Sequence, residues 1–215
     1  MDKSNIKVII FDIDGTLIDG ISWLKMTESL GADVQIHKKI FEELKNEKIS
    51  YPESKSQLIN LWLSTNHANK QNLLYIFNSW NLKIDAKEII NYLKSKYEVI
   101  LISGSLDLYV KTIAKKLNIK TWYANTTIFW DKNNKIYDFN YEENQAKKKL
   151  EQLNQFLYKS GYKKENCLII GDGDSDLILF KELSYGIAIN KKPFLELEKL
   201  AWKKITNLSE IKELL

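Results

Sequence analysis

The fold of this chain is decided by the stretch Val8-Ile9-Ile10-Phe11-Asp12-Ile13-Asp14-Gly15-Thr16-Leu17. The apolar, largely β-branched run predicts a strand over residues 6–11 that is buried on both faces of a sheet. Two aspartates follow at once, and burial of two carboxylates is unfavourable unless a cation neutralises them. Ligands of open α/β sheets bind at the carboxyl ends of strands, so Asp12 and Asp14 are predicted to form a metal site. The plainer alternative is a strand that ends in a polar turn at Asp14-Gly15.

Length and composition indicate a globular protein. The chain has 215 residues, of which 44% are hydrophobic and 28% charged, which fits one domain with an insertion or two small domains. No apolar run approaches the roughly 20 residues of a membrane helix, and the first residues lack the apolar segment of a signal peptide. The single Cys167 excludes an internal disulfide. We therefore expect a cytoplasmic protein without a membrane partner.

The charge pattern gives little reason to expect a nucleic-acid partner. The formal net charge is +4, and the lysines are scattered along the chain rather than gathered in blocks. The sequence contains no arginine, so all 32 basic residues are lysines. Bidentate guanidinium contacts are therefore excluded, and lysine ammonium groups and backbone amides must bind any phosphate or carboxylate. The sequence leaves the oligomeric state unknown.

Strands and helices alternate on both sides of a long helical stretch. Strands are expected at 6–11, 97–102, 121–124, 167–170 and 186–189, with a hairpin over 127–137 that turns at Asn133-Asn134. Helices are expected at 22–31, 36–44, 54–63, 71–80, 86–96, 106–117, 145–160, 177–183 and 208–215, and another opens at Lys192-Pro193. This alternation predicts an α/β fold with a doubly wound parallel sheet. Residues 1–20 and 86–215 would form the core, and residues 21–85 a small helical cap inserted after the first strand.

Two more polar, glycine-containing segments follow predicted strands. Ser103-Gly104-Ser105 follows the strand at 97–102, where a hydroxyl and the N–H groups of the next helix would cradle a phosphate. Gly171-Asp172-Gly173-Asp174-Ser175-Asp176 follows the strand at 167–170. Acidic capping of the next helix would account for the last two aspartates but not for Asp172. Both segments are expected at the sheet edge that carries Asp12.

In order and placement, these segments resemble the motifs of the haloacid dehalogenase superfamily, in particular its phosphoserine-phosphatase-like subfamily. The resemblance implies that Asp12 is a nucleophile and that Asp14 is a general acid and base. It also implies a Mg²⁺ cofactor bound by Asp12, the backbone carbonyl of Asp14 and Asp172, with Asp176 holding a metal-bound water or a ligand in place. Ser103 and Gly104 would bind the phosphate.

The superfamily also has a lysine before its last motif, and three neighbouring lysines compete for that place. The apolar face of the helix expected at 145–160 is centred on Ala146, Leu150, Leu153 and Leu157. Lys148 points away from this face, whereas Lys147 and Lys149 flank it on opposite sides. In the subfamily an apolar residue typically follows four positions after the lysine. Lys149 with Leu153 fits this pattern and is favoured, with Lys147 as the alternative.

The resemblance implies a Mg²⁺-dependent phosphatase that acts on a small phosphorylated metabolite. A phosphotransferase that passes the phosphoryl group to an alcohol would use the same residues. A non-catalytic binding protein is disfavoured because every expected catalytic residue type is present. Phosphoserine is one candidate substrate, although Lys55 and Asp19 would have to stand in for the cap arginine and the glutamate of phosphoserine phosphatases. An aromatic-rich cap would also suit an amine such as phosphocholine, through cation–π contact.

The aromatic residues and histidines of the expected cap have plainer interpretations. Most of Trp23, Trp62, Phe77 and Trp80 are expected to pack in the core of the cap, although they could line a pocket. His37 and His67 are expected at its surface, because neither has the spacing of a metal ligand.

Overall fold

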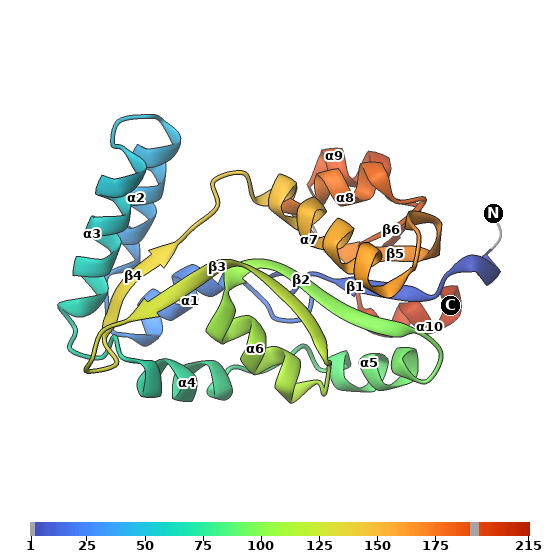
Figure 1. The fold of residues 1–215 in the computed structure, drawn as a ribbon, viewed down its shortest axis with the longest axis horizontal. Coiled ribbons are helices and arrows are strands. Elements are labelled where there is room, and N and C mark those ends of the chain that lie inside the picture. Colours follow the sequence, from blue (N-terminus) through green and yellow to red (C-terminus); the bar gives the residue numbers. More distant parts are fainter. Residues whose placement is uncertain (1–2, 190–193) are drawn as a thin grey trace.

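The computed structural model describes residues 3–189 and 194–215. A seven-stranded sheet in the order β4-β3-β2-β1-β5-β6-β7 forms its centre (Figure 1). The strands are β1 (Val8–Phe11), β2 (Glu98–Leu106), β3 (Thr121–Trp130), β4 (Ile136–Asn140), β5 (Cys167–Gly171), β6 (Tyr185–Ile189) and β7 (Lys203–Ile205). The α-helices are α1 (Ser22–Ser29), α2 (Val34–Lys45), α3 (Tyr51–Leu63), α4 (Lys70–Ser79), α5 (Ala86–Lys94), α6 (Asp107–Lys116), α7 (Gln145–Ser160), α8 (Leu177–Glu182), α9 (Leu195–Leu200) and α10 (Ile211–Leu214).

Strand β1 lies in the middle of the sheet and is buried along its whole length. Ile10 is in register with Ile100 of β2 on one side and with Ile169 of β5 on the other, and both pairings are parallel. All four residues of β1 are buried, as an uninterrupted apolar run predicts. The expected doubly wound α/β fold is confirmed, and only β4, at one edge of the described sheet, runs antiparallel to its neighbour.

Helices cover both faces of the sheet. Ile9 and Phe11 of β1 belong to the apolar cluster on one face, where α5 and α6 pack, whereas Val8 and Ile10 belong to the cluster beneath α7, α8 and α9 (Figure 1). Adjacent residues of a strand point to opposite faces, so β1 contributes to both cores at once. The carboxyl end of β1 is thereby held rigidly at the centre of the molecule.

Helices α1 to α4 gather at one end of the molecule, together with β4 (Figure 1, left). Strand β3 pairs with β2 through Thr126 and with β4 from Thr127 onward, so it reaches from the sheet into this end. We expected a short strand and a separate hairpin. They form one continuous strand because the residues between them stay extended and pair first with β2 and then with β4. Lys55 of α3 pairs with Asp138 of β4 at 2.8 Å, which ties the hairpin to the helices.

Two other features differ from the expectations, and one expectation falls outside the described residues. Strand β2 continues to Leu106 and therefore includes Ser103 to Ser105, with an irregularity between Ser103 and Leu106 that interrupts its register with β3. Strand β7 was not expected, because its three residues, Lys203–Ile205, are mostly exposed and lysine-rich. The helix start expected at Lys192-Pro193 lies outside the described residues.

Within the described residues, no helix is long and apolar enough to cross a membrane.

The aromatic core expected between α1 and α4 is confirmed, but one histidine is misplaced. Trp62 and Phe77 are fully buried, and Trp23 and Trp80 are nearly so. The prediction that His37 is a surface residue is wrong, because its exposed fraction is 0%. It lies on the same buried face of α2 as Ile40, and its ring stacks at 4.8 Å from that of Phe41. His67 is exposed, as predicted.

Candidate active site

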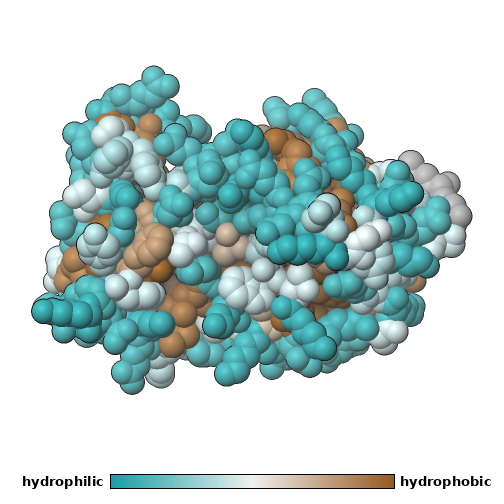
Figure 2. Space-filling view, in the orientation of Figure 1, coloured by the Kyte–Doolittle hydropathy of each residue, from teal (hydrophilic) through white to brown (hydrophobic). Residues whose placement is uncertain are grey.

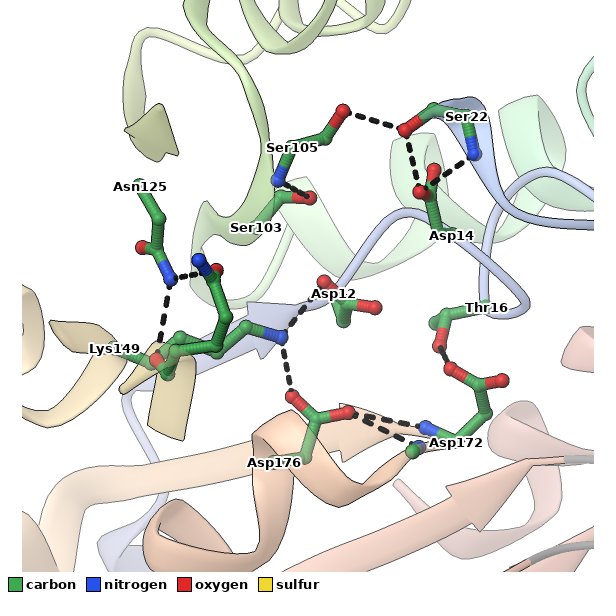
Figure 3. A network of polar contacts seen from close by, with 12 residues as sticks. Asp12, Asp14, Thr16, Ser22, Ser103, Ser105, Asn125, Lys149, Asp172 and Asp176 are labelled. Carbon is green, nitrogen blue, oxygen red and sulfur yellow. Dashed lines mark hydrogen bonds and ion pairs between the residues drawn. The ribbon is translucent and has the colours of Figure 1, made fainter. Parts of the chain in front are cut away.

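Asp12 follows the last residue of β1 and is 5% exposed. Its Oδ1 accepts a hydrogen bond from Lys149 Nζ at 2.9 Å, and the same ammonium contacts Oδ1 of Asp176 at 2.7 Å (Figure 3). Lys149 itself is fully buried on the inner face of α7. The competing Lys147 is exposed. The structure therefore brings Lys149, and not Lys147, to the carboxylate of Asp12.

Asp172 and Asp176 lie on the loop that follows β5. Asp176 Oδ2 accepts hydrogen bonds from the N–H groups of Asp172 and Gly173, at 3.2 and 3.4 Å, so it closes this loop while its other oxygen meets Lys149. Asp172 points toward the β1 loop, where Thr16 Oγ1 donates to its Oδ1 at 3.4 Å (Figure 3). The two loops are so close that a Cβ at Gly15 would lie 1.9 Å from Asp172 Oδ2. Gly15 also has a φ of +72°, so both space and backbone favour glycine there.

The carboxylates of this cluster are held in unfavourable surroundings. Burial raises the pKa of Asp12, against the opposing effect of Lys149. Burial and the neighbouring Asp176 raise the pKa of Asp172 to about 7. Burial opposes the charge of Lys149, but Asp12 and Asp176 outweigh it and raise the pKa of that ammonium. The cluster therefore favours additional positive charge.

The arrangement fits a divalent cation. Carboxylate oxygens of Asp12, Asp172 and Asp176 lie within 4.8 Å of one another. Such an all-oxygen set is what Mg²⁺ prefers, and a bound cation would offset the repulsion that raises these pKa values. Lys149 occupies one oxygen each of Asp12 and Asp176. Asp172 and the remaining oxygen of Asp12 are therefore the side-chain donors best placed to bind a metal.

Asp14 is turned toward α1 and α6 rather than toward the other carboxylates. Its Oδ2 accepts from the backbone N–H and the hydroxyl of Ser22, at 2.8 and 2.5 Å (Figure 3). Its Oδ1 accepts from Tyr109 OH at 3.0 Å. The hydroxyl of Ser22 also contacts Ser105 Oγ at 2.5 Å. Burial raises the pKa of Asp14, although hydrogen bonds from Ser22 and Tyr109 oppose the shift. A carboxyl group that retains its proton more readily is suited to donate one.

A cavity of about 220 Å³ opens above these groups. It is lined by Asp12, Asp14, Ile21, Trp23, Phe41, Ser103, Gly104, Ser105, Tyr141, Gln145 and Ser175. An adjoining cavity of about 400 Å³ shares Asp12 and Asp14 and adds Asp172. Four of the residues expected to act on or bind a phosphate, Asp12, Asp14, Ser103 and Gly104, thus face one small space. Lys149 and Asp176 lie beneath it.

A family model described as haloacid dehalogenase-like hydrolase matches residues 6–183, from β1 to the end of α8. The chain belongs to this family. The hydrolase is 27% identical over 198 residues to a protein of Methanocaldococcus jannaschii named phosphoserine phosphatase, with 91% of this chain and 90% of the relative covered. It is 26% identical over 211 residues to a protein of the same name from Campylobacter jejuni subsp. doylei, with 96% and 98% covered.

Solved structures share the fold of the hydrolase. A substrate-bound phosphoserine phosphatase complex matches with a TM-score of 0.74 at 24% identity, over 98% of each chain. A phospho-aspartyl intermediate analogue of phosphoserine phosphatase matches with a TM-score of 0.73 at 24% identity, over 98% of this chain and 99% of that one. At this level of identity, the matches establish a common architecture.

Sequence reasoning missed several groups that organise the site of the hydrolase. Ser22 and Tyr109 hold Asp14, and Lys83 Nζ donates to the carbonyl of Gly15 at 2.5 Å. A serine at the start of a predicted helix is usually interpreted as a helix cap. The sequence around Tyr109 does not distinguish it from other aromatic residues of the core. Conversely, Asp19 is 88% exposed and pairs with Lys83, so it does not line the cavity.

Proposed function

We propose that this hydrolase is a metal-dependent phosphomonoesterase that forms an aspartyl-phosphate on Asp12. The observation that carries the proposal is the ion pair between Lys149 and one oxygen of Asp12, at the floor of a cavity also lined by Ser103 and Gly104. The named function of the two curated relatives supports a phosphate ester as the substrate. A cavity of about 220 Å³ lies below the usual range of roughly 300–1,000 Å³ for ligand sites and suits a small metabolite.

The first step would be attack of the Asp12 carboxylate on phosphorus, while Lys149 holds that carboxylate in place. The bond between phosphorus and the ester oxygen breaks, and Asp14 supplies the proton that the leaving alcohol takes up. In the second step Asp14 removes a proton from water as that water attacks the same phosphorus. The bond from phosphorus to Asp12 breaks, which restores both carboxyl groups to their initial states.

Charge on the transferring phosphoryl oxygens would be stabilised by Lys149, by the hydroxyl of Ser103 and by the N–H of Gly104. A bound Mg²⁺, held by Asp12, Asp172 and the backbone carbonyl of Asp14, would supply the positive charge that lets an anionic phosphate approach a carboxylate. Asp176 would keep Lys149 and the Asp172 loop in place, because it contacts both.

Helices α1 to α4 and the β3–β4 hairpin would act as the cap that limits water at the site. Trp23 of α1 and Phe41 of α2 line the same cavity as Asp12. The space-filling view shows the cap end and the α8–α9 end rising on either side of a notch (Figure 2). Closure over a bound ester would exclude bulk water from the first step. The cap boundaries at residues 21 and 85 remain a prediction, and the hairpin extends the proposed cap beyond them.

The test is release of phosphate from p-nitrophenyl phosphate, with Mg²⁺ or with EDTA, by wild type and by Asp12→Asn. Asp131→Asn is the matched control: this aspartate lies in the β3–β4 turn, where its Oδ1 accepts two backbone hydrogen bonds that an asparagine oxygen can keep. We expect Mg²⁺-dependent turnover in wild type and control and none in Asp12→Asn. Turnover that survives either EDTA or Asp12→Asn would contradict the proposal.

A further inference from the structure

Part of the lining of the cavity that contains Asp12 is an aromatic wall. The ring of Trp23 lies 6.3 Å from that of Phe41 at an interplanar angle of 80°, and 5.8 Å from that of Tyr141 at 85°. All three side chains line the cavity, together with the apolar Ile21. Rings set at right angles to one another present their faces and edges around a corner. A group released from the phosphate would lie in this corner.

No basic side chain of the described residues lines this cavity. Lys149 lies beneath it, beside Asp12 and Asp176, where it would serve the phosphate and not the leaving group. Lys55, the candidate for binding a substrate carboxylate, is instead paired with Asp138 at 2.8 Å. A carboxylate on the leaving group would therefore be buried against aromatic rings without a cationic partner in the described structure, which is unfavourable.

The cavity that adjoins the aromatic wall carries negative charge. An adjoining cavity of about 520 Å³ shares Tyr141 and Gln145 with the first and is also lined by Glu143 and Asp174, which are exposed. Burial raises the pKa of Tyr141, and the carboxylates of Asp174 and Glu143 add to the shift, so both act on this part of the wall. A leaving group that meets aromatic faces and carboxylates at once is favoured if it is a cation.

We infer that the substrate is the phosphate ester of a short amino alcohol whose nitrogen is a methylated or quaternary ammonium and which carries no carboxylate. This inference rests on the proposed phosphomonoesterase activity. The phosphate would lie over Asp12, Ser103 and Gly104, and the ammonium in the corner formed by Trp23, Phe41 and Tyr141. Asp12 and the three rings line one cavity of about 220 Å³, which suits a two- or three-carbon linker between the phosphate and the ammonium.

The test compares kcat/KM for phosphocholine with that for 3,3-dimethylbutyl phosphate, which has the same shape but carbon in place of the charged nitrogen. Phosphoserine and p-nitrophenyl phosphate complete the panel. We expect phosphocholine to exceed its neutral analogue by about tenfold, the effect of one good cation–π contact, and phosphoserine to be poorer than both. Equal values for phosphocholine and the neutral analogue, or a preference for phosphoserine, would overturn the inference.

Phe41→Leu separates ring electrostatics from packing, because leucine keeps an apolar side chain there. We expect the ratio of phosphocholine to dimethylbutyl phosphate to fall toward one in Phe41→Leu. It should stay at the wild-type value in Tyr75→Leu, which changes an aromatic residue of α4 that is 74% exposed. An unchanged ratio in Phe41→Leu would overturn the role of this ring. Turnover of p-nitrophenyl phosphate without the charge preference would overturn the inference alone, whereas failure to hydrolyse any of the four esters would overturn the proposed function as well.

Discussion

Ser22, the first residue of α1, donates both its backbone N–H and its hydroxyl to one carboxylate oxygen of Asp14, at 2.8 and 2.5 Å. The proposed cap and the proposed acid/base group are therefore directly connected. Movement of α1 would change the hydrogen bonding, and with it the orientation, of the Asp14 carboxyl group.

This connection predicts that Ser22→Ala lowers kcat without unfolding the protein. The variant keeps the backbone donor but loses the hydroxyl, which contacts both Asp14 and Ser105. We expect kcat to fall by roughly tenfold, less than the roughly 100-fold or more that loss of general acid/base catalysis costs. Steady-state kinetics check this, with Ser56→Ala on the exposed side of α3 as the control. A wild-type kcat in Ser22→Ala would show that the serine does not position Asp14.

Replacement of Lys149 by methionine should abolish activity and destabilise the protein. Removal of one partner from a buried ion pair typically costs about 3–5 kcal/mol, and Lys149 has two such partners, Asp12 and Asp176. Denaturant unfolding in EDTA measures the loss. Lys147→Met, two positions away and exposed, should match wild type in stability and turnover. If Lys147→Met were the inactive variant, the assignment of the phosphate-binding lysine would be reversed.

Asp172→Asn should weaken metal binding and yet stabilise the metal-free protein. Burial and Asp176 raise the pKa of Asp172 to about 7, so above that pH its ionised form destabilises the metal-free protein relative to the unfolded chain. We therefore expect the variant in EDTA at pH 8 to be more stable than wild type, by on the order of 1 kcal/mol. Mg²⁺ should raise the Tm of wild type but not of Asp172→Asn. Equal stabilisation of both proteins by Mg²⁺ would remove Asp172 from the metal site.

The buried His37 predicts an acid-sensitive cap. Burial lowers its pKa from 6.5 to about 4, so between these pH values the unfolded chain binds a proton that the folded protein does not. The contribution of His37 to stability is fully present above pH 6.5 and is lost as the pH falls toward 4, by up to about 3 kcal/mol. In His37→Phe the free energy of unfolding should depend less steeply on pH in this window, whereas His67→Phe, which changes an exposed histidine, should keep the wild-type slope. Identical slopes in wild type and His37→Phe would contradict this account.

The sequence was most informative where chemistry and periodicity coincide. The two aspartates after β1 and the aspartates after β5 could be placed at one sheet edge because parallel strands align their carboxyl ends. Lys147 and Lys149 both flank the apolar face of α7, and Lys149 could be favoured because Leu153 follows it four positions on, as in the family that the chain resembles. Its position next to Asp12 follows from the packing of that face on the sheet.

The remaining features depend on contacts that have no local signal. Tyr109 and Asp14 are 95 positions apart and meet only because α6 packs beneath the β1 loop. His37 was placed at the surface because histidine is usually polar and exposed, but its spacing from Ile40 sets both residues on one face of α2. The extension of β3 into the proposed cap could not be foreseen either, since its pairing partner changes from β2 to β4 within one strand.

Acid quenching during turnover would trap a phosphoryl group on Asp12 if this residue is the nucleophile. Wild type and Asp12→Asn would be mixed with Mg²⁺ and p-nitrophenyl phosphate, quenched within one turnover, and examined by intact-protein and peptide mass spectrometry. We expect one added phosphoryl group in wild type, on the peptide that contains Asp12, and none in Asp12→Asn. A phosphoryl group on another residue, or undiminished turnover in Asp12→Asn, would contradict this role of Asp12.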